Sequence, residues 1–169
     1  MKAIIVYESM WGNTAAVARA VAEGIGPEAM ALNTSEATAE MIADADLIVG
    51  GSPLMGFMMP TQSTRDTLAS GKQHRDNPPD LSNPSMRSWF KTLSPGSGHG
   101  AGYETGLGWS PGSAAKKIAR KLASTGYETV LDHERFLVAG TYGPLNDGEI
   151  ERAKAWGATI AEKVKRTTE

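Results

Sequence analysis

An α/β fold built on a parallel β-sheet is predicted by three features of the sequence. Short apolar runs typical of β-strands alternate with amphipathic helical patterns along the chain. The run Leu47-Ile48-Val49 is continuously apolar, as expected of a strand that helices cover on both faces. The 169 residues suffice for one well-buried core but not for two comfortable domains, so we expect a single domain over residues 1–169.

The first strand is expected at Ala3–Tyr7, which is an uninterrupted apolar run. A helix over Ala15–Gly24 follows, because apolar residues recur there at helical spacing and glycines close the pattern. A weak strand at Ala29–Leu32 and a short helix at Glu36–Ala43 then precede the third strand, at Leu47–Val49. These five elements predict a strand-helix-strand-helix-strand unit with right-handed crossovers.

The middle of the chain predicts two further helices, at Thr61–Ser70 and Ser85–Leu93. Between them Gly71–Pro84 is rich in Pro, Asn, Asp and Gly, which indicates an exposed loop. The fourth strand is expected near Gly100–Glu104, although its glycines give it poor strand propensity. It is the weakest prediction of the series.

The last part of the chain has the clearest helical pattern, at Ser113–Thr125, between Pro111-Gly112 and Gly126. Phe136–Gly140 is the expected last core strand, with an extended segment at Glu128–Leu131 before it. A final helix is expected at Asp147–Val164. Five strands that alternate with helices predict a doubly wound parallel sheet with helices on both faces.

Composition narrows the classes of function. Cysteine is absent, which excludes disulfides, thiolate catalysis and cysteine-ligated metal clusters. The three histidines are scattered, so we expect no metal site. The net charge of −2 predicts no nucleic-acid partner. No apolar run approaches the roughly 20 residues of a transmembrane helix, and no signal peptide is evident, so we expect a cytoplasmic location.

The segment Glu8–Thr14 is the strongest functional signal. It joins a strand to a helix through Ser, Gly, Asn and Thr, and the free N–H groups and positive dipole end of a helix bind phosphate without any basic residue. Capping residues also occur in such turns when nothing binds there. The place of this turn after the first strand of a doubly wound pattern favours an anion-binding site. Ser52–Pro60 and Tyr103–Trp109 follow later strands and should share its edge of the sheet.

These segments resemble the loops of the flavodoxin family. Ser9, Gly12, Asn13 and Thr14 match its phosphate loop, whereas Trp11 stands where a Thr is usual. Residues 50–53, Gly-Gly-Ser-Pro, followed by Leu-Met-Gly-Phe at 54–57, resemble its second flavin loop. The resemblance covers nearly the whole chain. It implies a flavodoxin-like three-layer sandwich with a five-stranded parallel sheet in the order 2-1-3-4-5, without the long insertion in the last strand.

The resemblance also implies FMN as cofactor, with a phosphate cradle at one end of its site and an apolar slot for the isoalloxazine at the other. The implied cofactor-binding residues are Ser9, Met10, Trp11, Gly12, Asn13, Thr14, Pro53, Leu54, Met55, Gly56, Phe57, Tyr103, Glu104, Thr105 and Trp109. Trp11, Met55, Phe57, Met58, Tyr103 and Trp109 are the candidates to cover the ring faces. Gly56 is the residue most free to reorient a peptide toward the ring.

The nearby carboxylates Glu8 and Glu104 are expected either to tune the flavin potential or to be solvated loop residues. No residue is expected to act as catalytic acid, base or nucleophile.

Three functions agree with these features. The first is an FMN protein that transfers electrons between redox protein partners. The second is a flavin-dependent oxidoreductase of the same fold, of quinone or protoporphyrinogen type, in which the segment Gly71–Gly98 and the glycine-rich third loop admit a small quinone-like substrate. The third is a binding module without FMN. Electron-carrier flavodoxins are strongly acidic, and a net charge of −2 is modest beside them.

Overall fold

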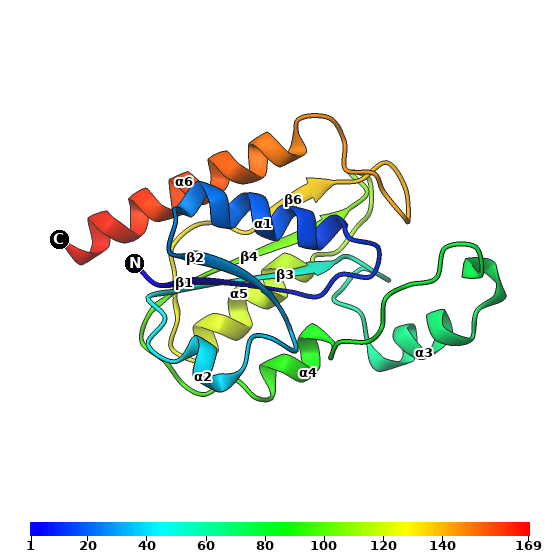
Figure 1. Ribbon diagram of the computed structural model, residues 1–169, viewed down its shortest axis with the longest axis horizontal. Helices are drawn as coiled ribbons and strands as arrows, with labels where there is room; N and C mark the ends of the chain where they lie inside the picture. The colour runs from blue at the N-terminus through cyan, green and yellow to red at the C-terminus, as the bar shows by residue number, and fades with distance from the viewer.

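The computed structural model describes all residues 1–169 and contains one β-sheet between two layers of helices (Figure 1). The strands are β1 (Ala3–Tyr7), β2 (Ala29–Asn33), β3 (Leu47–Pro53), β4 (His99–Gly106), β5 (Glu128–Thr129) and β6 (Glu134–Leu137). The helices are α1 (Asn13–Ile25), α2 (Ala39–Ile42), α3 (Gln62–Ser70), the 3-10 helix η1 (Lys72–His74), α4 (Met86–Phe90), α5 (Ala114–Ser124) and α6 (Glu149–Thr168). No helix has both the length and the apolar character needed to cross a membrane.

The sheet is parallel throughout, with the strand order β2-β1-β3-β4-β5. Its fifth position is shared, because β5 pairs with the first residues of β4 and β6 pairs with its last residues. The predicted five-position parallel sheet in the order 2-1-3-4-5 is therefore confirmed. The last core strand lies at Glu134–Leu137 rather than at the predicted Phe136–Gly140, so residues 138–141 belong to a loop at the carboxyl edge of the sheet.

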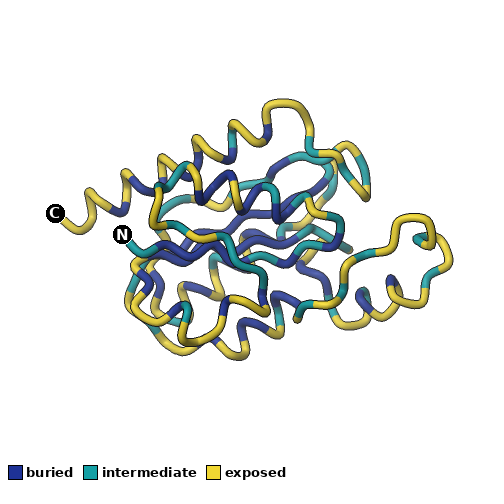
Figure 2. The backbone as a smooth tube through the Cα atoms, in the orientation of Figure 1, coloured by how far each residue is buried: buried dark blue, intermediate teal, exposed yellow.

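Each face of the sheet has its own apolar cluster. α1 and α6 cover one face, where Val17 and Ile160 pack on the strands, and α2, α4 and α5 cover the other, where Trp89 and Ile118 do so (Figure 1). The strands between the two layers are the most buried part of the molecule (Figure 2). α3 and η1 instead extend beyond the sheet at its carboxyl edge, to the right in Figure 1, and are largely exposed.

β4 has eight residues and is the longest strand, although its sequence predicted the weakest one. A Cβ at Gly102 would overlap the backbone of Ala115 in α5, and a Cβ at Gly50 would overlap the side chain of Ile118. These glycines let α5 lie directly on β3 and β4, so packing outweighs the poor strand propensity. β4 therefore continues through Thr105 to Gly106, beyond its predicted end at Glu104.

Candidate functional site

The turn between β1 and α1 presents an uncapped helix N-terminus at the carboxyl edge of the sheet. Gly12 is the N-cap residue, its φ is +91°, and no side chain caps the first turn of α1. The first helix amide that donates within the backbone is that of Ala16, to the oxygen of Gly12 at 3.0 Å. The amides of residues 13–15 precede it and point out of the first turn, where an anion would accept from them.

The side chains of this turn already have partners within the protein. Ser9 Oγ accepts from the amide of Gly12 at 3.1 Å and keeps its own hydrogen for another acceptor. Thr14 Oγ1 lies 2.8 Å from Thr105 Oγ1, and Asn13 Nδ2 donates to the oxygen of Tyr142 at 3.1 Å. Backbone amides and the Ser9 hydroxyl are therefore the main donors that the turn offers to an anion.

A cavity of about 290 Å³ lies beside this turn, among the loops that follow β1, β3, β4 and β6. It is lined by Ser9, Met10, Trp11, Asn13, Thr14, Pro53, Leu54, Met55, Gly56, Thr64, Thr105, Gly106, Leu107, Val138, Gly140 and Thr141. No Lys, Arg, Asp or Glu is among them. One end of the cavity is the helix N-terminus, and apolar side chains line much of the remainder.

Most of the residues predicted for cofactor binding line this cavity. They are Ser9, Met10, Trp11, Asn13, Thr14, Pro53, Leu54, Met55, Gly56 and Thr105. Gly12 lines a smaller neighbouring cavity of about 180 Å³, and Phe57 and Trp109 are exposed outside both. Sequence reasoning missed Thr64, Gly106, Leu107, Val138, Gly140 and Thr141. Three of these follow the last core strand, so the carboxyl-edge rule that found the other loops also applied to them.

Tyr103 and Glu104 are corrections, because both lie within the core and line neither cavity. Tyr103 is fully buried, and its hydroxyl donates to the oxygen of Thr14 at 2.9 Å. Its ring packs edge-on against Phe136 and Trp156. The physical reason is the length of β4, whose last two residues continue past both side chains and move the start of the loop to residue 107.

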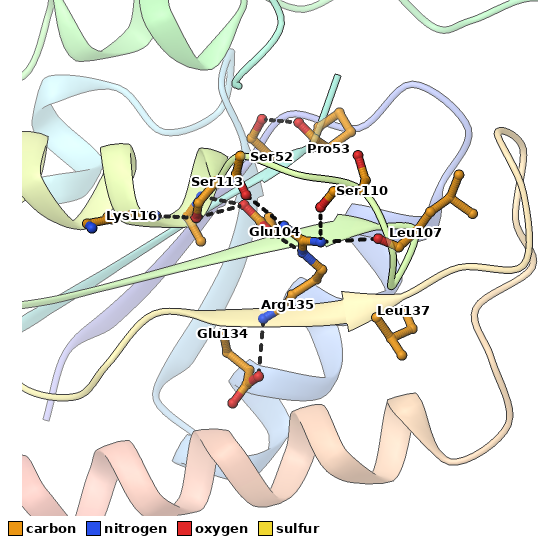
Figure 3. A network of polar contacts seen from close by, with 12 residues as sticks. Ser52, Pro53, Glu104, Leu107, Ser110, Ser113, Lys116, Glu134, Arg135 and Leu137 are labelled. Atoms are coloured by element: carbon orange, nitrogen blue, oxygen red, sulfur yellow. Dashed lines mark hydrogen bonds and ion pairs between the residues drawn. The ribbon is translucent and has the colours of Figure 1, made fainter. Parts of the chain in front are cut away.

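Glu104 accepts hydrogen bonds both from the start of α5 and from Arg135, beside the third loop at residues 107–112 (Figure 3). Its Oε2 accepts from the amide of Ala115 at 2.8 Å and from Ser113 Oγ at 3.2 Å, and its Oε1 accepts from Arg135 Nε at 2.6 Å. Glu104 is therefore neither a solvated carboxylate nor a wall of the cavity. It is the buried counterion of Arg135.

Arg135 fixes the third loop, residues 107–112, by its backbone. The guanidinium donates to the oxygens of Leu107 at 3.1 Å, Ser110 at 2.6 Å and Gly112 at 2.8 Å. The planar guanidinium of one residue thereby holds the loop at three of its backbone carbonyls. Because Trp109 lies within this loop, Arg135 also sets the position from which that indole projects.

The second loop forms a tight hairpin turn at the rim of the cavity. Met55 and Met58 exchange backbone hydrogen bonds of 2.9 and 3.3 Å, and Gly56 and Phe57 between them both have positive φ. Two consecutive positive φ values are typical of a type I′ turn, which is unfavourable for a Phe. The turn presents Phe57 and Met58 to solvent, whereas Met59 is fully buried and anchors the loop in the core.

Glu8 lies on the other side of the first turn and is buried against Arg65. The Arg65 guanidinium donates to its carboxylate at 3.0 Å and to the backbone oxygens of Leu81 and Asn83. Burial raises the pKa of the Glu8 carboxyl above its ordinary value, and the positive charge of Arg65 opposes this shift. The pair fastens the segment that precedes α4 to the carboxyl end of β1.

The segment Gly71–Pro84 is largely exposed, as predicted, and it contacts the turn between β1 and α1. The amide of Asp80 donates to the oxygen of Met10 at 2.8 Å, and Trp11 Nε1 donates to the oxygen of Asn77 at 3.0 Å. His74 and Tyr142 pack against the Trp11 ring, with ring centroids 5.6 and 5.1 Å from it. Trp11 therefore joins three loops around the first turn.

Glu149 anchors the wall of the cavity that residues 138–141 form, because its carboxylate accepts from the amide of Leu137. Arg152 and this amide both donate to the carboxylate and hold its pKa below the ordinary value of 4.5. In the acid range the Glu149 carboxyl therefore binds fewer protons in the folded state than in the unfolded chain. Its contribution to the free energy of unfolding is present above pH 4.5 and is lost as the pH falls below that value. We expect Glu149→Gln to lower unfolding free energy by about 1–2 kcal/mol at pH 7. Urea unfolding between pH 7 and pH 3 should show that the difference between the two proteins shrinks below pH 4.5. Glu151 is exposed, so the control Glu151→Gln should change the free energy of unfolding little at any pH. A difference for Glu149→Gln that does not depend on pH would contradict the assignment.

A parallel sheet in this order, with helices on both faces and a cavity at its carboxyl edge, defines the class of doubly wound α/β proteins. No protein-family model and no curated protein matches the sequence. Solved structures do match. One is a flavodoxin from the domain Archaea, with 26% identity, a TM-score of 0.68, and 98% of this chain and 99% of that chain covered.

A second similar structure is oxidised flavodoxin 1 from Bacillus cereus, with 18% identity, a TM-score of 0.67, and 96% of this chain and 98% of that chain covered. The Flv1 flavodiiron core from Synechocystis sp. PCC6803 is also similar, with 24% identity and a TM-score of 0.61; 98% of this chain covers 36% of that longer chain. The chain has a flavodoxin-like fold over nearly its whole length, as the resemblance of its loops predicted.

Proposed function

We propose that this protein binds FMN in the cavity at the carboxyl edge and transfers electrons between redox partners. The observation that carries the proposal is the uncapped N-terminus of α1, whose first two residues, Asn13 and Thr14, line a cavity without a single charged side chain. A phosphate monoester placed there accepts from backbone amides and from the Ser9 hydroxyl, and the helix dipole stabilises its charge.

The residues present fit the remainder of FMN. The cavity, at about 290 Å³, lies near the lower end of the roughly 300–1,000 Å³ of small-molecule sites, so part of a flavin ring would extend to the exposed loops. Leu54, Met55 and Leu107 supply apolar contacts for a flat ring. Phe57 and Trp109 stand outside the cavity and supply aromatic surface at its rim.

FMN, when bound, supplies one- and two-electron exchange, and the chain's own residues bind and shield it. The turn at Gly56 and Phe57 keeps backbone donors and acceptors at the rim of the cavity, where they can bond the edge of a ring. Arg135 holds the opposite loop in place through three carbonyls. No side chain in the cavity is required as an acid, a base or a nucleophile.

The position of residues 77 and 80 favours electron transfer over turnover of a small quinone-like substrate. In the enzyme alternative the segment Gly71–Gly98 and the third loop admit the substrate over the ring, but Asn77 and Asp80 bond Trp11 and Met10 beside the phosphate end. The rim at Phe57 and Trp109 is an exposed surface and not an enclosed second pocket. A partner protein can reach such a rim, whereas a small substrate would gain little enclosure there.

Titration of the purified, flavin-free protein with FMN tests the proposal. We expect tight binding, read as a shift of the flavin absorption bands and quenching of flavin fluorescence. Riboflavin, which lacks the phosphate, should bind at least about tenfold more weakly if the helix N-terminus carries the phosphate. A protein indifferent to micromolar FMN would refute FMN binding, and equal affinities for the two flavins would refute the phosphate site.

A further inference from the structure

The charge of this protein is divided between two regions of the chain. Between Leu81 and Tyr127 there are six of the 17 Lys and Arg residues but only one of the 19 Asp and Glu residues. That single acid is Glu104, which is buried and paired with Arg135. The rest of the chain holds the other eleven basic and eighteen acidic residues. The modest net charge of −2 therefore conceals a strongly basic region within an acidic molecule.

Five of the six cations are exposed on the layer of α4 and α5, which we call the basic face, and four of the five are on α5. The five are Lys91, Lys116, Lys117, Arg120 and Lys121, and none of them forms an ion pair. On α5 the spacing of four residues places Lys116 beside Arg120 and Lys117 beside Lys121. Each such like-charge pair disfavours a helix by about 0.2–0.5 kcal/mol. Lys121, in the last turn of α5, gains from the negative end of the helix dipole, but helix stability gives no reason for the other three cations of α5.

The basic face begins at the same edge of the molecule as the cavity. The amide of Ala115, in the first turn of α5, donates to Glu104 near the carboxyl end of β4. Lys116 and Lys117 follow at once, and the loop that carries Trp109 immediately precedes the helix. The sixth cation, Arg87 of α4, donates to the oxygen of Met59 at 3.1 Å, directly behind the second loop.

An apolar rim lies between this basic face and the cavity. It consists of Phe57, Met58 and Trp109, whose exposed fractions are 60%, 43% and 79%. The second and third loops touch, because a Cβ at Gly112 would overlap the backbone of Phe57. Phe57 is also held at a positive φ, an unfavourable conformation for an aromatic residue that is left in solvent. The second loop therefore contacts the loop that leads directly into α5, the helix that carries four of the five exposed cations.

We propose that the apolar rim and the basic face together dock an acidic redox protein. The proposal rests on the proposed function, since the rim borders the cavity to which we assign FMN. Exposed cations attract and orient an acidic partner, and the three apolar side chains exclude water at the centre of the contact. The charge of this surface is opposite in sign to that of a strongly acidic electron carrier, which selects basic partners. An extended polyanion or an anionic membrane that bound this face would also approach the acidic residues elsewhere on the chain, which repel it. A compact acidic protein can contact the basic face without approaching those residues.

Two forms of one electron acceptor test whether the protein prefers an acidic partner to a basic one. Native cytochrome c is basic, and succinylated cytochrome c keeps the same haem and fold but is acidic. At low ionic strength the reduced, FMN-loaded protein should reduce the succinylated form at least about tenfold faster, and added salt should reduce the difference. The double variant K116E/K117E should lower the rate with the succinylated form by about tenfold and raise the rate with the native form.

A matched control separates local from overall charge. The variant K163E/R166E makes the same change of net charge on exposed residues of α6, in the other helix layer. It should leave the preference for the acidic acceptor nearly unchanged. Equal effects of the two double variants, or a preference of the unmodified protein for native cytochrome c, would overturn the proposal.

Binding without electron transfer makes the test independent of FMN. Succinylated cytochrome c added to the ¹⁵N-labelled protein should shift the Trp109 indole signal and the amide signals of α5, whether or not FMN is present. Failure to bind FMN with these shifts retained would refute the proposed function alone. FMN binding without the shifts would refute the docking surface alone. Binding to anionic lipid vesicles or to a DNA oligonucleotide through the same lysines, without these shifts, would also refute an acidic protein partner.

Discussion

Replacing Glu104 with Gln is expected to lower the free energy of unfolding by about 3 kcal/mol, at the lower end of the range for breaking a buried ion pair. Gln keeps the shape but removes the charge that Arg135 Nε, Ser113 Oγ and the Ala115 amide all share. The lower end applies because the Arg135 side chain is still 22% exposed to water. Urea-induced unfolding, followed by tryptophan fluorescence, measures the loss.

Glu134→Gln is the matched control for this prediction. Glu134 lies on β6 next to Arg135, but its ion pair with Arg152 is well exposed and should contribute less than about 1 kcal/mol. Arg135→Met should be as destabilising as Glu104→Gln, because it leaves three loop carbonyls and one carboxylate without their donor. A loss below 1 kcal/mol for Glu104→Gln would contradict the role of Glu104 as a buried counterion.

The turn between β1 and α1 was predictable because its signals are local. An apolar strand, a short turn with Gly12 and a helical pattern are adjacent in the sequence, and together they determine where the helix amides point. The carboxyl-edge rule then placed the second loop, and Pro53, Leu54, Met55 and Gly56 do line the cavity. The alternation of strands and helices predicts only a doubly wound parallel sheet, and the order 2-1-3-4-5 came from the resemblance of the loops to the flavodoxin family.

The ring end was less predictable because it depends on contacts between distant residues. Close packing of α5 on Gly102 supports a longer β4 than strand propensity indicates, and the two residues beyond the predicted end at Glu104 keep Tyr103 and Glu104 out of the loop. Arg135 carries no local sign of its role, since its partners are a glutamate 31 residues away and backbone carbonyls. The burial of Met59 beside the exposed Met58 depends likewise on the turn geometry.

Replacing Gly12 with Asp is expected to weaken FMN binding by at least about 100-fold while the fold is retained. A Cβ at Gly12 meets no atom within 4 Å, and Asp tolerates positive φ better than most residues. The introduced carboxylate would lie beside the first turn of α1, whose amides we assign to the phosphate. The phosphate would then face a like charge. FMN titration of the variant measures the change.

Gly12→Asn distinguishes charge from shape in this experiment. Asn has the same size, tolerates the same φ and also caps helices, but it brings no negative charge. We expect its FMN affinity to lie between those of the unmodified protein and Gly12→Asp, and riboflavin affinity to be similar in all three because riboflavin has no phosphate to repel. Near-ultraviolet circular dichroism confirms that each variant is folded. Unchanged FMN affinity in a folded Gly12→Asp variant would show that the phosphate does not bind at the N-terminus of α1.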